Sequence, residues 1–462
     1  MGLMEKDAIQ KTLSAALSTG GDYAELFFED TTRNSLEYKD GRVETTLSGR
    51  DFGAGIRVLS GVNYTYAYTS DVSESGLVRA AEAAASAMPG AFGAVPLALT
   101  VRPKREMQPI KMAPSPSYAE KRAAITKEAH DAVRAHSTEI VQATSSVGDI
   151  IQNVIIANSE GLYVEDRRAR SRFMVQAVAA KDGEMQTGYW GPGAGAGFEF
   201  YGSIDIEALS KDAAQSAITM LHAPFAPAGM MPAVIGDGFG GVIFHEACGH
   251  SLESARVGKN QSEFTGLLGE KIANSAVTAI DDGSMLGYWG STGYDDEGFP
   301  TQKNVLIERG ILKAYMTDLI GARRMGSLQT GNGRRQSYRY APTSRMTNTY
   351  LAPGTDENLI KTMGSGLYAK KMGGGSVNPL TGEFNFAVVE GYLIKNGELH
   401  SPVRGATLIG KGSDVLKKID MVGRDLALAE GMCGAESGSI PTCVGQPMIR
   451  VSSILVGGRE AE

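Results

Sequence analysis

The chain has 462 residues, which is too long for one ordinary hydrophobic core and predicts two or three domains. Its residues are 42% hydrophobic and 21% charged, a balance that excludes an intrinsically disordered protein. The net charge of −7 argues against nucleic acid or an anionic membrane as a partner.

Cysteine usage and the N-terminus indicate the compartment. Three cysteines (Cys248, Cys433 and Cys443) are too few for a disulfide framework in a chain of this length. The N-terminal residues lack an apolar core of signal-peptide length, and no run of about 18 apolar residues is present to span a membrane. We therefore expect a reduced, cytoplasmic protein without a membrane segment.

The first residues predict a helix followed by an antiparallel sheet. Asp7–Leu17 carries apolar residues at helical spacing, and Val78–Met88 is an alanine-rich segment that predicts a second helix. Between Tyr23 and Tyr68 the pattern has a period of two, which predicts short strands. Turn signals at Lys39–Gly41 and Ser60–Val62 separate these strands.

A second, similar pass follows the proline-rich connector Pro89–Ser117. It begins with a predicted helix over Tyr118–Ala135, continues with strands, and ends with an amphipathic helix over Ile206–Leu221. We therefore assign residues 1–225 to an N-terminal α+β region of two subdomains, about 1–95 and 115–225, with helices on antiparallel sheets.

The remaining residues, 230–462, are assigned to a C-terminal domain. Val305–Tyr315 and Ala387–Leu399 each predict a hairpin around a turn that contains glycine. Two similar hairpins with short strands between them predict a mostly antiparallel, barrel-like β domain. The fold class expected for the whole chain is α+β.

The stretch Gly236–Glu253 concentrates groups that bind and activate a metal ion. It holds two of the six histidines, His245 and His250, and Glu246 follows the first of them. Imidazoles bind zinc, and a neighbouring carboxylate can act as the base toward a metal-activated water. The alternative is a buried helix whose histidines are structural.

The two histidines stand at positions i and i+5, one residue further apart than in the common zinc-peptidase helix motif. On an ideal α-helix this separates them by roughly 140° of rotation, which does not suit one tetrahedral ion. A π-bulge brings such side chains together, and an irregularity at Gly249 is the other solution. The spacing therefore predicts a departure from α-helix between Ala247 and His250.

A catalytic zinc takes three protein ligands and leaves one position open. The candidates for the third ligand are Glu253, Cys248, Cys433 and Cys443. Glu253 lies one helical turn after His250, whereas Cys433 lies among glycines that allow a close backbone approach. For each cysteine the alternative is a small buried hydrophobic residue.

The run GFGGVIFHEACGHSLE resembles the HExxxH signature of the TldD subfamily of the TldD/PmbA metalloproteases. Further segments resemble blocks of that family in the same order: Asp295–Thr301, Ser344–Tyr350, Gly373–Gly375, Gly405–Gly410, Gly431–Gly434 and Val444–Pro447. The first half resembles the family more loosely, through Tyr23–Leu59. Because PmbA-type chains lack the HExxxH residues, their presence places this chain on the TldD side.

The resemblance implies a set of site residues. His245, His250 and Cys433 are the implied Zn²⁺ ligands, and Glu246 is the implied catalytic acid and base. Cys248 falls at a variable position of the motif, and Cys443 falls where the family pattern has no cysteine. The resemblance also implies a cytoplasmic dimer, either a heterodimer with a PmbA/TldE-type paralogue or a homodimer, that acts on unfolded or modified peptides.

The expected function is zinc-dependent peptide hydrolysis with Glu246 as the general base. The alternative is a metal-stabilised peptide-binding subunit that is inactive without a PmbA-type partner. Gly373, Gly374 and Gly375 are expected to present a strand edge to the substrate, and a glycine-rich turn is the alternative. Arg345 belongs to a basic cluster with Arg334, Arg335 and Arg339 that is a candidate site for a peptide carboxylate, against the alternative of a solvated surface.

Overall fold

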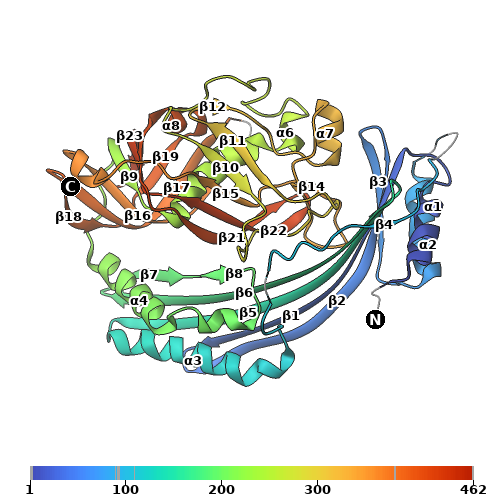
Figure 1. The fold of residues 1–462 in the computed structure, drawn as a ribbon. Coiled ribbons are helices and arrows are strands. Elements are labelled where there is room, and N and C mark those ends of the chain that lie inside the picture. Colours follow the sequence, from blue (N-terminus) through green and yellow to red (C-terminus); the bar gives the residue numbers. More distant parts are fainter. Residues whose placement is uncertain (1–3, 89, 91–93, 109, 379–380, 460–462) are drawn as a thin grey trace.

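The first half of the chain is built on one long, curved sheet (Figure 1). The computed structural model describes residues 4–88, 90, 94–108, 110–378 and 381–459. The strands of this sheet follow the order β3–β2–β1–β5–β6–β4, and β7 and β8 also pair with β6. Their bounds are β1 (Tyr23–Lys39), β2 (Arg42–Ser60), β3 (Asn63–Thr69), β4 (Thr100–Val101), β5 (Ile140–Asn158), β6 (Leu162–Lys181), β7 (Glu184–Trp190) and β8 (Gly193–Ala194).

The two predicted passes share this sheet, because β1 pairs with β5 from Glu25 to Lys39. Helices α1 (Lys6–Ala16) and α2 (Glu74–Ser86) cover one end of the sheet, and α3 (Ala119–His136) and α4 (Ile206–His222) cover the other (Figure 1). Each pair buries apolar side chains against the strands. The connector Pro89–Ser117 contains β4 and a short 3₁₀ turn (Pro116–Tyr118), and its Pro89 and Pro109 lie outside the described residues.

The strands are longer than the sequence pattern predicts. The segment Tyr23–Tyr68 forms three continuous strands rather than a series of short ones, with turns at Asp40-Gly41 and Gly61, where φ is positive. The prediction was too short because polar residues in the middle of these strands interrupt the alternation of apolar and polar residues in the sequence. One of them, Asn34, is buried and donates a hydrogen bond to Asp149 on β5, so its polarity marks a cross-strand contact and not a turn.

The second half contains a closed barrel, as predicted. Strand β16 pairs with both β9 and β17, which closes the order β16–β9–β23–β19–β17 on itself. The barrel strands are β9 (Gly229–Ile235), β16 (Ser365–Val377), β17 (Glu383–Lys395), β19 (Thr407–Lys411) and β23 (Ile449–Gly457). Strands β18 (Glu398–Val403) and β20 (Ile419–Val422) extend it, and the α+β fold class is confirmed.

A further sheet packs beside the barrel in the order β12–β11–β10–β15–β22–β21. Its strands are β10 (Ala279–Asp282), β11 (Lys303–Glu308), β12 (Ile311–Leu312), β15 (Asn348–Leu351), β21 (Ala427–Ala435) and β22 (Gly438–Gln446). Smaller elements are β13 (Gly333–Arg334), β14 (Thr343–Ser344), α6 (Ser254–Val257), α7 (Leu319–Met325), α8 (Gly412–Lys418) and 3₁₀ turns at Phe198–Gly202 and Leu359–Thr362. The segment that carries His245 lies between barrel and sheet, because its apolar side chains share one core with both.

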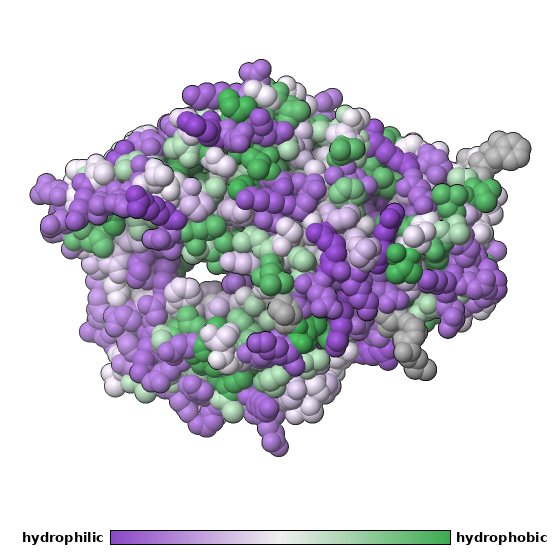
Figure 2. All heavy atoms as spheres, viewed as in Figure 1, coloured by the Kyte–Doolittle hydropathy of each residue, from purple (hydrophilic) through white to green (hydrophobic). Residues whose placement is uncertain are grey.

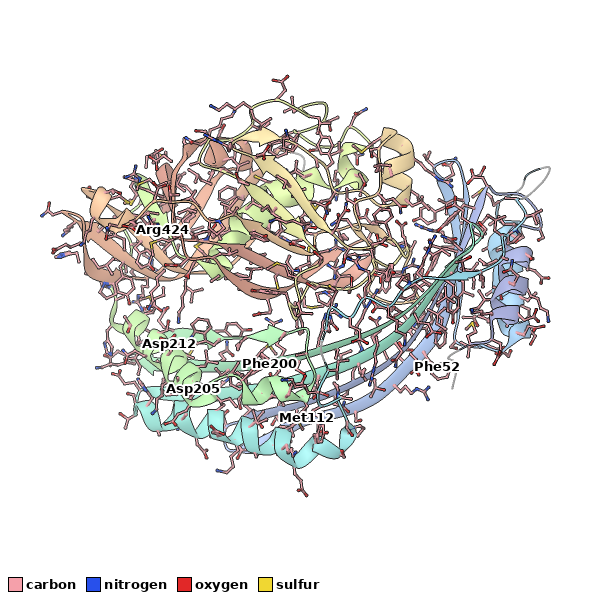
Figure 3. The ribbon with its side chains drawn as sticks, in the orientation of Figure 1. Phe52, Met112, Phe200, Asp205, Asp212 and Arg424 are labelled. Atoms are coloured by element: carbon pink, nitrogen blue, oxygen red, sulfur yellow. The ribbon has the colours of Figure 1, made fainter. Side chains whose placement is uncertain are left out.

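Buried charges connect the curved sheet to the C-terminal half. Arg57 on β2 donates hydrogen bonds to Glu25 and to Glu297, at 2.7 and 2.5 Å. At the other end, Lys371 on β16 forms an ion pair with Asp212 of α4, which Figure 3 labels. Between these contacts, Figure 2 shows an opening that separates the C-terminal half from the layer of β7 and α4. In the described part of the chain, no helix combines the length and hydropathy needed to cross a membrane.

Candidate metal centre

The segment that carries the two histidines changes its helical type three times. A 3₁₀ turn (Gly238–Gly241) leads into α5 (Val242–Phe244), a π-helical turn covers His245–Gly249, and a 3₁₀ turn covers His250–Leu252. The helix then ends, because Glu253 is extended, with φ −78° and ψ 134°. The predicted departure from α-helix before His250 is confirmed, and the π-turn places the two imidazole rings edge to face, with centroids 5.1 Å apart.

Two glycines let this segment lie against its neighbours. A Cβ on Gly241 would be 2.5 Å from the backbone nitrogen of Gly445 on β22. A Cβ on Gly249 would be 2.3 Å from Sδ of Met346. Real Cβ atoms do not come this close to other atoms. Any residue other than glycine at these two positions would therefore force the neighbouring backbone or side chain to move.

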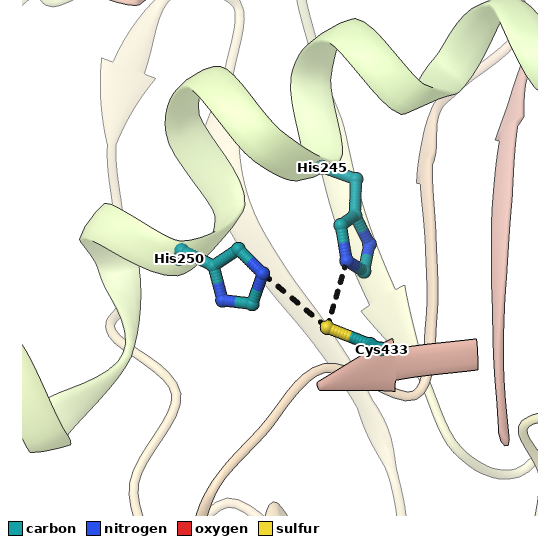
Figure 4. Close-up of side chains that lie close together, drawn as sticks. All are labelled: His245, His250 and Cys433. Atoms are coloured by element: carbon teal, nitrogen blue, oxygen red, sulfur yellow. Dashed lines mark hydrogen bonds between the residues drawn. The ribbon is translucent and has the colours of Figure 1, made fainter. Parts of the chain in front are cut away.

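Cys433 on β21 lies between the two histidines (Figure 4). Its Sγ is 3.3 Å from Nε2 of His245 and 3.3 Å from Nε2 of His250. The three potential ligand atoms all lie within 4.8 Å of one another. The structure therefore brings together residues that are 188 and 183 positions apart in the chain.

The environment of Cys433 lowers the pKa of its thiol and so favours the thiolate. Burial alone would raise its pKa, but the hydrogen bonds from His245 and His250 outweigh burial and lower the pKa to about 4. Burial lowers the pKa of His250, but the charges of Glu253 and Cys433 outweigh it and raise that pKa well above its usual value. A thiolate is the form of cysteine that binds a metal.

These residues fit a zinc ion. Nitrogen and sulfur ligands of a tetrahedral zinc stand roughly 3.5 Å apart, from their usual bond lengths. The observed separations of 3.3 Å leave room for an ion with little movement. Two imidazoles and one thiolate are a donor set that zinc accepts, with a fourth position open.

Neighbouring residues form hydrogen bonds with two of the three candidate ligands, His250 and Cys433. Glu253 accepts a hydrogen bond from Nδ1 of His250 at 3.1 Å and one from the backbone N–H of Met346 at 3.3 Å. Arg345 donates to the carbonyl oxygen of Cys433 at 2.6 Å. In contrast, Nδ1 of His245 is buried and has no hydrogen-bond partner among the described residues. From residue types alone, Glu253 was a candidate ligand. Its position three residues after His250 also allows the observed hydrogen bond with Nδ1 of that histidine, which orients the ring.

Glu246 lies at the mouth of the site. It lines a pocket of about 200 Å³ together with His250, Arg345, Val377 and Gly434–Glu436. Its Oε2 is 3.7 Å from Nε2 of His250. The carboxylate of Glu246 therefore lies beside the His250 ring and lines the same pocket.

The other predicted ligands lie elsewhere. Cys248 and Cys443 are both buried, Cys248 within the apolar core of the C-terminal half, and burial raises the pKa of each, to about 12 for Cys443. Neither belongs to the ligand cluster formed by the described residues. Both therefore match the alternative of a small buried hydrophobic residue.

The predicted substrate contacts are placed as follows. Gly373, Gly374 and Gly375 lie in β16 where its register with β17 shifts, and a Cβ on Gly375 would be 2.0 Å from the carbonyl oxygen of Asn385. Gly375 thus permits close packing of β17, whereas Gly374 is exposed with open space around it. Arg345 is 1% exposed and lines the pocket, and it donates a hydrogen bond to the carbonyl oxygen of Cys433.

The alternative of a solvated surface is wrong for Arg334 and Arg335, as it is for Arg345. Arg334 is buried and donates to the carbonyl oxygens of Met346 and Pro441. Arg335 is buried and donates to Glu25 at 2.6 Å. Of the four arginines, Arg339 alone is exposed in the described structure, where it pairs with Asp51 at 3.0 Å.

Comparison with family models matches three consecutive segments. Residues 24–87 match PmbA/TldA metallopeptidase domain 1, residues 113–221 match the central domain, and residues 228–458 match the C-terminal domain. The cluster of His245, His250 and Cys433, which could hold a metal ion, lies wholly within the C-terminal match.

Known proteins resemble the chain over most or about half of its length. A metalloprotease TldD homolog of Haemophilus influenzae is 36% identical over 458 residues, which cover 95% of this chain and 93% of that protein. A zinc metalloprotease TldD homolog of Saccharolobus solfataricus is 33% identical over 55% of this chain and 58% of its own length. Among solved structures, a Thermotoga maritima protein aligns with TM-score 0.77 at 24% identity, over 94% of this chain and 96% of its own. TldE from Thermococcus kodakarensis aligns with TM-score 0.74 at 20% identity, over 95% and 97%.

Proposed function

The chain belongs to the PmbA/TldD metallopeptidase family, and from this premise we propose that it is a zinc-dependent peptidase acting on unfolded or modified peptides. The observation that carries the proposal is the contact of one thiol with two imidazoles at 3.3 Å each, beside a pocket that Glu246 lines. His245, His250 and Cys433 would hold the ion. When bound, zinc supplies a Lewis acid that lowers the pKa of a water and polarises a peptide carbonyl.

Three side chains, Glu246, Glu253 and Arg345, have the remaining roles in the proposed reaction. Glu246 accepts a proton from the attacking water and delivers it to the leaving amine, so that the base is regenerated in each cycle. Glu253 fixes the ring of His250, with the proton on Nδ1 and Nε2 directed to the site. Arg345 fixes the backbone of Cys433 and so the position of its sulfur.

An extended substrate would reach Glu246 through the pocket. Val377, at the end of β16, and Gly434, on β21, border this pocket from two sides. We propose that the backbone at the half-buried Gly373 and the exposed Gly374 continues the binding surface along β16. A chain that binds through backbone contacts must be unfolded locally, which agrees with unfolded peptides as substrates.

We also propose a PmbA/TldE-type paralogue as a partner, supported by the likeness of the fold to TldE. The cytoplasm is the proposed compartment, because the cysteines of the described chain are free thiols. A metal-stabilised binding subunit without activity is the less favoured alternative, since relatives that match along the whole chain are named metalloproteases.

The test uses the purified chain, with and without the paralogue, an unfolded peptide and product analysis by mass spectrometry. We expect cleavage that a chelator stops and that added zinc restores. The variant Glu246→Gln should keep its zinc and lose cleavage, because only the base is changed. Cleavage at the wild-type rate by this variant would exclude Glu246 as the base, and a binding subunit would bind zinc but yield no products in the absence of the paralogue.

A further inference from the structure

The pocket beside the candidate metal centre contains hydrogen-bond donors that lack an acceptor in the protein. Its volume is about 200 Å³, and its lining includes Glu246, His250, Arg256, Thr343 and Arg345. Nε of Arg345 and Oγ1 of Thr343 are buried, and neither has a hydrogen-bond partner among the described residues. A buried donor without an acceptor costs stability unless a bound group satisfies it. These atoms therefore indicate a ligand that accepts hydrogen bonds.

Arg256 adds an unpaired positive charge to the same pocket. Its side chain is half-buried, and it forms no hydrogen bond or ion pair with any other described residue, although Glu246 and Glu436 also line the pocket. By contrast, the half-buried Arg323 pairs with Asp22 at 2.6 Å. All N–H groups of the Arg256 guanidinium thus remain for a ligand.

The backbone of Arg256 is held in place although its side chain is unpaired. Helix α6 (Ser254–Val257) lies beside α7 and β14 (Figure 1). The backbone N–H of Ala255 donates to Oγ of Ser344 at 2.9 Å, and that of Arg256 donates to the carbonyl oxygen of Glu253 at 3.0 Å. The guanidinium is therefore presented to the pocket from a fixed turn.

A carboxylate matches this set of donors. It accepts two parallel hydrogen bonds from a guanidinium, which is a strong and specific form of recognition. It can also accept from a hydroxyl such as that of Thr343. In a peptide the group is either the C-terminus or the side chain of Asp or Glu. Because Glu246 and His250 line the same small pocket, the carboxylate would lie only a few residues from the scissile bond.

We propose that Arg256 binds a carboxylate of the substrate peptide in this pocket, so that the centre acts on bonds close to a C-terminus or to an acidic residue. This inference rests on the proposed peptidase function and adds a substrate class to it. Arg345, the arginine that the sequence suggested for such a role, uses both Nη groups in hydrogen bonds to residues 433–438.

The test measures binding separately from cleavage. The zinc-loaded, full-length Glu246→Gln variant is titrated into a labelled unfolded peptide that ends in a free carboxylate or in an amide, and fluorescence anisotropy gives the dissociation constants. A second pair of peptides, both amidated, differs only by Asp or Asn at one position. We expect a carboxylate to lower the dissociation constant by about tenfold. A preference for the free acid over the amide identifies the C-terminus as the source, and a preference for Asp over Asn identifies the side chain.

Substitutions of Arg256 in the same background test its role. Arg256→Gln should remove the preference, and Arg256→Lys should keep part of it, because the charge remains but the planar fork is lost. The matched control is Arg324→Gln, since Arg324 on α7 is also half-buried and has no side-chain partner among the described residues, but does not line the pocket. This control should keep the full preference. Circular dichroism checks that each variant is folded.

Equal binding within both peptide pairs, or a preference that survives Arg256→Gln, would overturn the proposal. Its failure is distinguishable from failure of the proposed function. Binding that prefers a carboxylate through Arg256, without cleavage by the wild type, would contradict the peptidase function and would still support the carboxylate site.

Discussion

Glu253 accepts the Nδ1–H of His250 at 3.1 Å, and this contact fixes which nitrogen of the imidazole faces Cys433. The carboxylate is itself held, because its other oxygen accepts from the backbone N–H of Met346. His245 has no such orienting partner for its own Nδ1 within the described residues. Of the two histidine rings, only that of His250 is oriented through its Nδ1, and this orientation depends on Glu253.

Replacing Glu253 with Gln should weaken zinc binding by about 10- to 100-fold, the usual effect of losing an outer hydrogen-bond partner of a ligand. The amide has nearly the same shape but no charge to stabilise the ring N–H. Competition with a chromophoric zinc chelator measures the change. The matched control is Glu308→Gln, an exposed carboxylate on β11. An unchanged zinc affinity in Glu253→Gln would contradict the orienting role.

The cysteines should respond to substitution in different ways. Cys433→Ser should reduce bound zinc from about one per chain to substoichiometric amounts, because a hydroxyl is a poor zinc ligand at neutral pH. Cys248→Ser and Cys443→Ser, which replace buried thiols outside the cluster, should keep their zinc. Metal content after gel filtration is the measurement. Retention of zinc by Cys433→Ser would assign the third ligand elsewhere.

The chain around His245 shows what the sequence could predict. The distance between the histidines in the sequence, together with the geometry of a helix, was enough to predict the irregular turn before His250. Turns at Asp40-Gly41 and Asn396-Gly397 were likewise predictable, because they need positive φ. Features of this kind depend on a few neighbouring residues.

Contacts between distant segments were beyond prediction from residue types. Arg335 donates to Glu25, 310 residues away, so nothing near Arg335 in the sequence indicates that it is buried. The same holds for Arg345, whose partner is the backbone of Cys433, 88 residues away. The resemblance to a family supplied the pairing of Cys433 with the histidines, which the residue types alone left open among four candidates.

Gly249 should not tolerate a side chain. The Cβ of Gly249→Ala would lie 2.3 Å from Sδ of Met346, so the helix or Met346 must move. Overpacking of this kind lowers the free energy of unfolding by about 1–3 kcal/mol, which urea unfolding measures. Gly364→Ala, at a position with no atom within 4 Å of the new Cβ, is the control and should change stability much less. Equal effects of the two substitutions would show that the contact with Met346 is not the cause.

Because of Glu29, the free energy of unfolding should fall as the pH rises. This side chain is 1% exposed on β1, and burial raises its pKa from 4.5 to about 7, partly offset by a hydrogen bond from Gln152. Because the folded state binds the proton more tightly, the stabilisation is complete below the unfolded pKa and is lost between about pH 4.5 and 7. The loss is on the order of 3 kcal/mol. Glu29→Gln stays neutral and can still accept from Gln152, so it should be more stable than the wild type at pH 8 and similar at pH 5. Urea unfolding at the two pH values is the measurement, and a variant that gains no stability at pH 8 would show that Glu29 is ionised in the folded protein at little cost.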